Sequence, residues 1–79
     1  MEQNNNTIAE QLGEINNMIS KSYVARAYFG KSRYWLSQKL NGNIVNGKPA
    51  KFTPAELETL RGALRDMSEQ LEKMSNSLI

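Results

Sequence analysis

The sequence predicts an all-α protein with four helices, at about residues 8–19, 22–29, 32–41 and 54–75. Apolar residues recur along these segments at steps of three and four, the spacing of one helix face. A serine or threonine precedes each segment as a helix cap, and a glycine follows each of the two central ones. The 79 residues suffice for one small domain. We expect it at residues 7–79, after a flexible start at residues 1–6.

The first helix is expected to begin after Thr7, because Thr7 and Glu10 have the spacing of a capping box. Its apolar face repeats at steps of four, three and four. Gly13 weakens the helix only slightly in this interpretation. The residues of the face are Ile8, Leu12, Ile15 and Ile19.

Two short helices follow, separated by a turn that contains Gly30. Ser20 or Ser22 caps the first helix and Ser32 the second, while Gly42 ends the second. Two short helices joined by such a turn are typical of a helix-turn-helix, which we expect at about residues 22–42.

Residues 43–52 are expected to form an ordered loop. Asn46-Gly47 is a strong hairpin turn signal, whereas Pro49 removes a backbone donor just after it. The sequence leaves open whether this loop forms a small wing or a plain connection.

The long last helix begins with Thr53 as cap, Pro54 at its first position and Glu56 three residues after the cap. Seven apolar residues then repeat with a heptad spacing. The stripe either packs on the other helices of the domain or forms a dimer seam. The two are compatible if the inner part of the helix packs within the domain and its outer end projects into a partner. The stripe consists of Leu57, Leu60, Leu64, Met67, Leu71, Met74 and Leu78, of which the last four form the candidate seam.

The composition excludes several classes of chemistry. Without cysteine and histidine, the chain has no disulfides, no Cys/His zinc site and no histidine general base. The acids Glu10 and Glu14 have no neighbouring base, and no phosphate-binding glycine loop is present. We therefore expect no enzyme, metal or cofactor. The polar, acidic start and the lack of an apolar run of roughly 18 residues indicate a cytoplasmic protein with no membrane partner.

Positive charge is concentrated in the middle of the chain. Residues 21–51 carry a net charge of +7 without a single acid, whereas residues 1–20 and 52–79 carry −3 and −2. This segment is interpreted as a site for a polyanion, the alternative being a solvated surface that lacks acids.

All six aromatic residues lie within this basic segment or at its edge. Rings among basic residues either stack on unpaired bases or fill the core of a domain with short helices. We expect core packing for Tyr28, Phe29 and Phe52, and the sequence leaves both roles open for Tyr34 and Trp35.

Residues 30–42 have the properties of a helix that enters the DNA major groove. Leu36 and Leu40 form its back, and the polar residues face outward. The expected base contacts are Arg33, Tyr34, Ser37, Gln38 and Asn41. The expected phosphate contacts are Lys21, Lys31, Ser32, Lys39, Lys48 and Lys51.

This segment resembles the recognition half of the phage-repressor/Cro type of helix-turn-helix domain. Seven residues match that pattern at the same spacing: Gly30, Ser32, Arg33, Leu36, Ser37, Asn41 and Gly42. The pattern has an alanine four residues before the glycine, where this chain has Arg26, with Ala25 one place earlier. Either the turn is one residue longer or the preceding helix is rotated. Trp35, in place of a small residue, is a second departure.

Residues 23–67 also resemble a family of small gut-bacterial proteins classed as a domain of unknown function. The shared segments are Tyr28 to Ser32, Trp35-Leu36 and Asn43 to Pro49. This resemblance implies no activity.

We therefore expect a sequence-specific DNA-binding helix-turn-helix protein, a small transcriptional or mobile-element regulator that binds double-stranded DNA. The alternative is a protein-interaction module that uses the C-terminal heptad helix and binds no nucleic acid. Besides DNA, the expected partner is a second copy of the chain, bound through the C-terminal helix.

Overall fold

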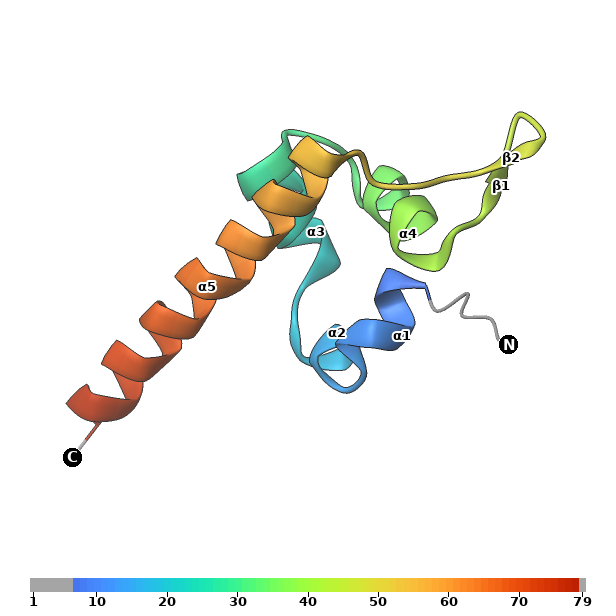
Figure 1. The fold of residues 1–79 in the computed structure, drawn as a ribbon. Coiled ribbons are helices and arrows are strands. Elements are labelled where there is room, and N and C mark those ends of the chain that lie inside the picture. Colours follow the sequence, from blue (N-terminus) through green and yellow to red (C-terminus); the bar gives the residue numbers. More distant parts are fainter. Residues whose placement is uncertain (1–6, 79) are drawn as a thin grey trace.

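Short helices pack on one side of the inner half of one long helix in the computed structural model, which describes residues 7–78 (Figure 1). The predicted flexible segment 1–6 lies outside these residues. The elements are α1 (Ile8–Leu12), α2 (Ile15–Met18), α3 (Lys21–Val24), the π-helical turn η1 (Ala25–Phe29), α4 (Arg33–Asn41), β1 (Ile44–Val45), β2 (Lys48–Pro49) and α5 (Pro54–Ser77).

The predicted single helix at residues 8–19 is wrong, because the chain turns at Gly13. The capping box of Thr7 and Glu10 is confirmed, with hydrogen bonds of 3.0 and 3.1 Å in the two directions. Gly13 then has a φ of 59°, which ends α1 and starts a new direction for α2. As a result, Ile15 lies half-exposed instead of continuing the apolar face.

Helix α3 runs directly into η1, so the predicted helix at residues 22–29 is present with one wider turn. Ser20 caps it by accepting a hydrogen bond from the Tyr23 amide. Ala25 is fully buried and Arg26 is exposed. The Ala25 carbonyl accepts from the amides of Gly30 and Lys31, which closes the π turn. The wider turn thus directs Ala25 toward the core.

The core lies where α3, η1, α4 and α5 meet. Its buried residues are Val24, Ala25, Leu36, Leu40 and Leu60. Helix α1 covers one side of α4, and Ile8, Ala9 and Leu12 pack against the core from there. These contacts fix α4 from behind.

Of the two alternatives that the sequence left open for residues 43–52, the structure has the small hairpin: β1 and β2 pair antiparallel, which adds a sheet to the predicted all-α fold. Asn46 and Gly47 have φ values of 54° and 80°, as a two-residue hairpin turn requires. Pro49 pairs with Ile44 at the end of the ribbon, where no third strand needs its missing amide hydrogen.

Helix α5 follows its predicted course and ends at Ser77, with both hydrogen bonds of the Thr53–Glu56 capping box. Its inner half packs on η1, while its outer half extends away from the other helices (Figure 1). None of the helices in residues 7–78 is long and apolar enough to cross a membrane.

Replacing Gly30 with alanine should lower the free energy of unfolding by about 1–2 kcal/mol. Gly30 has a φ of 66°, which costs an L-residue strain, and no atom lies within 4 Å of an added Cβ. Gly62→Ala is the matched control, because Gly62 lies inside α5 with equally open space and should gain about 0.5–1 kcal/mol. Urea unfolding followed by circular dichroism measures both. Equal effects of the two changes would show that the left-handed conformation at residue 30 does not require glycine.

Candidate nucleic-acid interface

Helix α4 is held rigidly at both ends and along its back. The Ser32 hydroxyl accepts a hydrogen bond of 3.1 Å from the Trp35 amide and caps the start of the helix. Gly42, with a φ of 65°, ends it. Leu36 and Leu40 are buried behind it. The other faces of α4 therefore have a fixed orientation.

The five predicted base-contacting residues all lie on α4, and three of them are exposed. Tyr34 is 82% exposed, and Arg33 and Asn41 are exposed on either side of it along the helix. Ser37 and Gln38 are half-buried. The accessible polar surface of α4 is thus centred on Arg33, Tyr34 and Asn41.

The five lysines among the predicted phosphate-contacting residues divide into two groups. Lys31, Lys48 and Lys51 are exposed and form no ion pair with another residue of the described chain. Lys31 lies just before α4, Lys48 on the hairpin beyond its C-terminal end, and Lys51 in the connection to α5 (Figure 1). The Ser32 hydroxyl is engaged as a cap.

The other two lysines are bound within the protein. The Lys21 ammonium group donates a hydrogen bond of 3.1 Å to the Asn16 carbonyl. The Lys39 ammonium group lies 2.8 Å from Glu56 Oε1, and both side chains are mostly buried. Lys39 therefore connects α4 to the first turn of α5. The sequence had predicted only a phosphate contact for this lysine.

The Lys39–Glu56 pair keeps the carboxylate charged. Burial alone would raise the pKa of Glu56, but hydrogen bonds from Lys39 and from the Thr53 amide, together with the lysine's charge, lower the pKa below its ordinary value. Glu56 thus serves as the capping residue of α5 and the partner of Lys39 at once.

Trp35, on α4, is half-buried and packs against two other aromatic rings. Its ring centroid lies 5.1 Å from that of Phe29 and 6.4 Å from that of Phe52. The ammonium groups of Lys39 and Lys31 lie 5.1 and 5.9 Å from the same ring. The predicted core role of Phe29 and Phe52 is confirmed, and Trp35 packs against both rings.

One anchoring contact was missed from the sequence. The Tyr28 hydroxyl donates a hydrogen bond of 2.6 Å to Asp66, which connects η1 to α5 across 38 residues of sequence. This hydrogen bond, with burial and the aspartate's charge, raises the pKa of Tyr28 to about 12. Neither residue belongs to a motif, so no local signal predicts the pair.

A family model described as "Domain of unknown function (DUF5053)" matches residues 8–78 of the chain. No curated protein and no solved structure matches the chain.

Proposed function

Because the chain belongs to this family of unknown function, we propose its activity from its own residues: it is a sequence-specific DNA-binding protein of the helix-turn-helix type. Helix α4 would enter the major groove of duplex DNA. We further propose a regulatory role in transcription or in a mobile element, in the cytoplasm. The observation that carries the proposal is the exposed polar surface of α4: Tyr34 and Asn41 lie on the side away from buried Leu36 and Leu40, and Arg33 is exposed at the start of the helix.

The chemistry of this face suits base edges. The Arg33 guanidinium matches the two acceptors of guanine, and the Asn41 amide matches the donor and acceptor of adenine. The Tyr34 ring can contact the thymine methyl group between them. Ser37 and Gln38, half-buried beside this face, are secondary candidates for base contacts.

The charges around α4 suit phosphate contacts on both sides of the groove. Lys31 is at the start of the helix, and Lys48 and Lys51 lie beyond its end. The hairpin would then act as a small wing. Strand β2, which carries the exposed Lys48, lies outside the packed part of the domain, where a phosphate can reach it (Figure 1).

Alanine at Arg33 should flatten sequence preference, whereas alanine at Lys48 should weaken binding to all sequences alike. The measurement is selection from a random duplex library, followed by titration of the selected and scrambled duplexes. We expect Arg33→Ala to lose about 10-fold or more for the selected duplex and little for the scrambled one, since a good bidentate base contact is worth ~1–3 kcal/mol.

Arg61→Ala is the matched control, because Arg61 is an exposed arginine on a different helix, α5, where it pairs with Glu58. It should leave both titrations unchanged. A library that yields no enriched sequence, or equal losses for Arg33→Ala and Arg61→Ala, would contradict base recognition by α4.

The bare outer half of α5 favours a second candidate function, a protein-interaction module that binds no nucleic acid. Leu71, Met74 and Leu78 are each more than half exposed there. A chain that binds no duplex at low salt but is retained by a partner through these residues would support this candidate in place of the first.

A further inference from the structure

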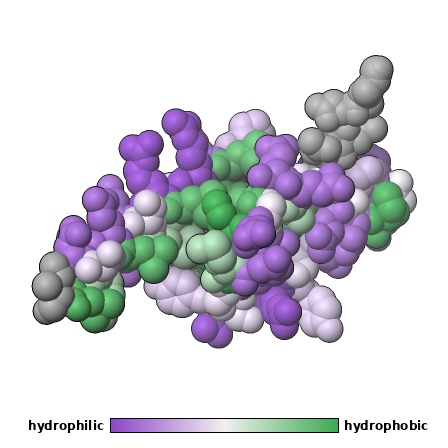
Figure 2. Space-filling view, turned by 90° about the horizontal axis from the view of Figure 1, so that it is seen from below, coloured by the Kyte–Doolittle hydropathy of each residue, from purple (hydrophilic) through white to green (hydrophobic). Residues whose placement is uncertain are grey.

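The heptad stripe of α5 is covered only between Leu60 and Met67. Leu60 is buried and Leu64 and Met67 are half-buried, whereas Leu71 and Leu78 are 66% and 71% exposed. Figure 2 shows apolar side chains across the middle of the molecule and again at the outer end of α5. A stripe of such length on one helix usually marks a helix–helix interface.

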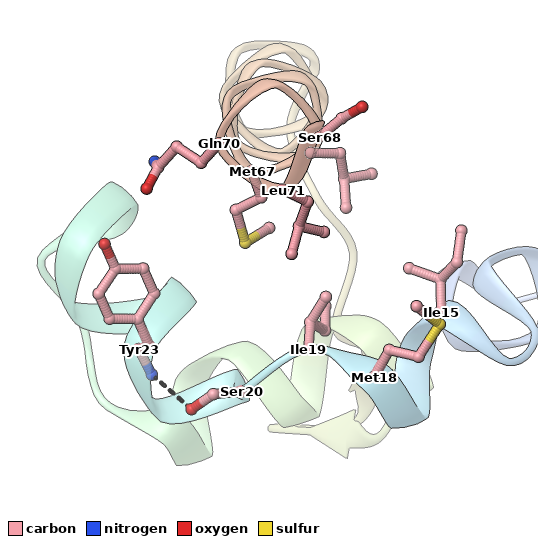
Figure 3. A pocket seen from close by; sticks show the side chains of 10 residues that line it. Ile15, Met18, Ile19, Ser20, Tyr23, Met67, Ser68, Gln70 and Leu71 are labelled. Atoms are coloured by element: carbon pink, nitrogen blue, oxygen red, sulfur yellow. Dashed lines mark hydrogen bonds between the residues drawn. The ribbon is translucent and has the colours of Figure 1, made fainter. Parts of the chain in front are cut away.

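An apolar groove between α2 and α5 continues the bare stripe. It has a volume of about 550 Å³. Met67 and Leu71 point from α5 toward Ile19, and Ile15 and Met18 form the neighbouring wall (Figure 3). Met18 is 73% exposed and Ile15 45%. The groove and the stripe form one surface.

We propose that a second copy of this chain covers this surface, with the outer halves of the two α5 helices packed antiparallel. Leu71 then faces Met74 of the second copy, and Met67 faces Leu78. In an antiparallel pair, each of the two apolar heptad positions faces the other position of the partner helix. Leu71 and Leu78 occupy one position and Met67 and Met74 the other, so a single two-fold axis satisfies this rule for all four residues. Leu78 of each copy reaches the groove between α2 and α5 of the other.

The residues that flank the stripe fit this arrangement. Ser68 lies opposite Ser75 of the second copy, and Gln70 opposite Ser77, so that short or neutral side chains line both edges. The charged residues of this segment, Glu69, Glu72 and Lys73, occupy the remaining faces. No charge is buried, and the backbones can approach closely.

The available area also fits a stable pair. The exposed parts of six apolar side chains present on the order of 700 Å² per chain, against roughly 800 Å² per partner in a standard interface. These side chains are Ile15, Met18, Tyr23, Leu71, Met74 and Leu78.

The mass of the full chain in solution tests the proposal, independently of DNA binding. Light scattering after gel filtration should give about 18 kDa, twice the 9.0 kDa of one chain. The double variant Leu71→Glu/Met74→Glu should shift it to the monomer, because it puts two charges into each half of the seam. Both positions are exposed, so circular dichroism should show an unchanged fold.

Lys73→Glu is the matched control, since it changes the net charge by the same two units on another face of α5, and it should remain a dimer. Orientation follows from disulfide formation, because the natural chain has no cysteine. A mixture of Ser68→Cys and Ser75→Cys chains should form the mixed disulfide in preference to either homodisulfide. A monomeric natural chain, a dimer that survives Leu71→Glu/Met74→Glu, or preferred homodisulfides would overturn the proposal.

Discussion

Leu36→Ala should unfold a large fraction of the protein at 37 °C. The Leu36 side chain is completely buried between α4 and the other core helices. Truncation of a buried leucine to alanine costs about 2–5 kcal/mol, through lost burial and the cavity that remains. A domain of this size has a net stability of roughly 3–5 kcal/mol, so the loss is comparable to the whole.

Thermal unfolding followed by circular dichroism checks this effect, with Leu57→Ala as control. Leu57→Ala removes the same atoms, but the Leu57 residue is 41% exposed at the start of α5. We expect a fall of the melting temperature of at least ~10 °C for Leu36→Ala and a much smaller one for Leu57→Ala. Similar falls for both variants would show that α4 is not held as described.

Local signals predicted the ends of the main helices well. Thr7, Ser32 and Thr53 act as caps as their sequence context indicates, and Gly30 and Gly42 have the left-handed conformation that ends a helix. These signals work because capping involves atoms within three or four residues of each other.

The effect of Gly13 was not predictable from the same local rules. A glycine in a helix costs only ~1 kcal/mol, so tertiary packing decides whether the helix continues. Here α1 packs on α4, while α2 turns toward α5, and the positive φ of Gly13 joins the two directions. The sequence interpretation assumed one straight helix, which would have covered more of the α5 stripe.

The candidate site was predictable as a helix but not residue by residue. Helical phase correctly placed Tyr34 and Asn41 outward and Leu36 and Leu40 inward. The distribution of charge along the sequence does not show that Lys39 is paired within the protein whereas Lys48 is exposed, because the partner of Lys39 is Glu56, 17 residues away. The contact that connects them depends on where α5 starts in space, which is a tertiary property.

The second large effect concerns charge. The change of three lysines, Lys31→Gln, Lys48→Gln and Lys51→Gln together, should weaken duplex binding by about 100-fold at 150 mM salt. Each of these side chains is exposed and free of ion pairs among residues 7–78, so each is available to replace a counterion on phosphate. The matched control removes three positive charges from α5 instead, by Arg61→Gln, Arg65→Gln and Lys73→Gln, and should change binding little.

The salt dependence of duplex DNA binding tests most directly whether this protein binds DNA through α4 and its surrounding lysines. Fluorescence anisotropy of a labelled duplex, titrated at several salt concentrations, gives the slope of log K against log salt. Three phosphate contacts predict a slope near −3 for the natural chain, and a slope near zero for the Lys31, Lys48 and Lys51 variant. No binding at low salt, a flat response of the natural chain, or an equal loss in the α5 control would contradict it.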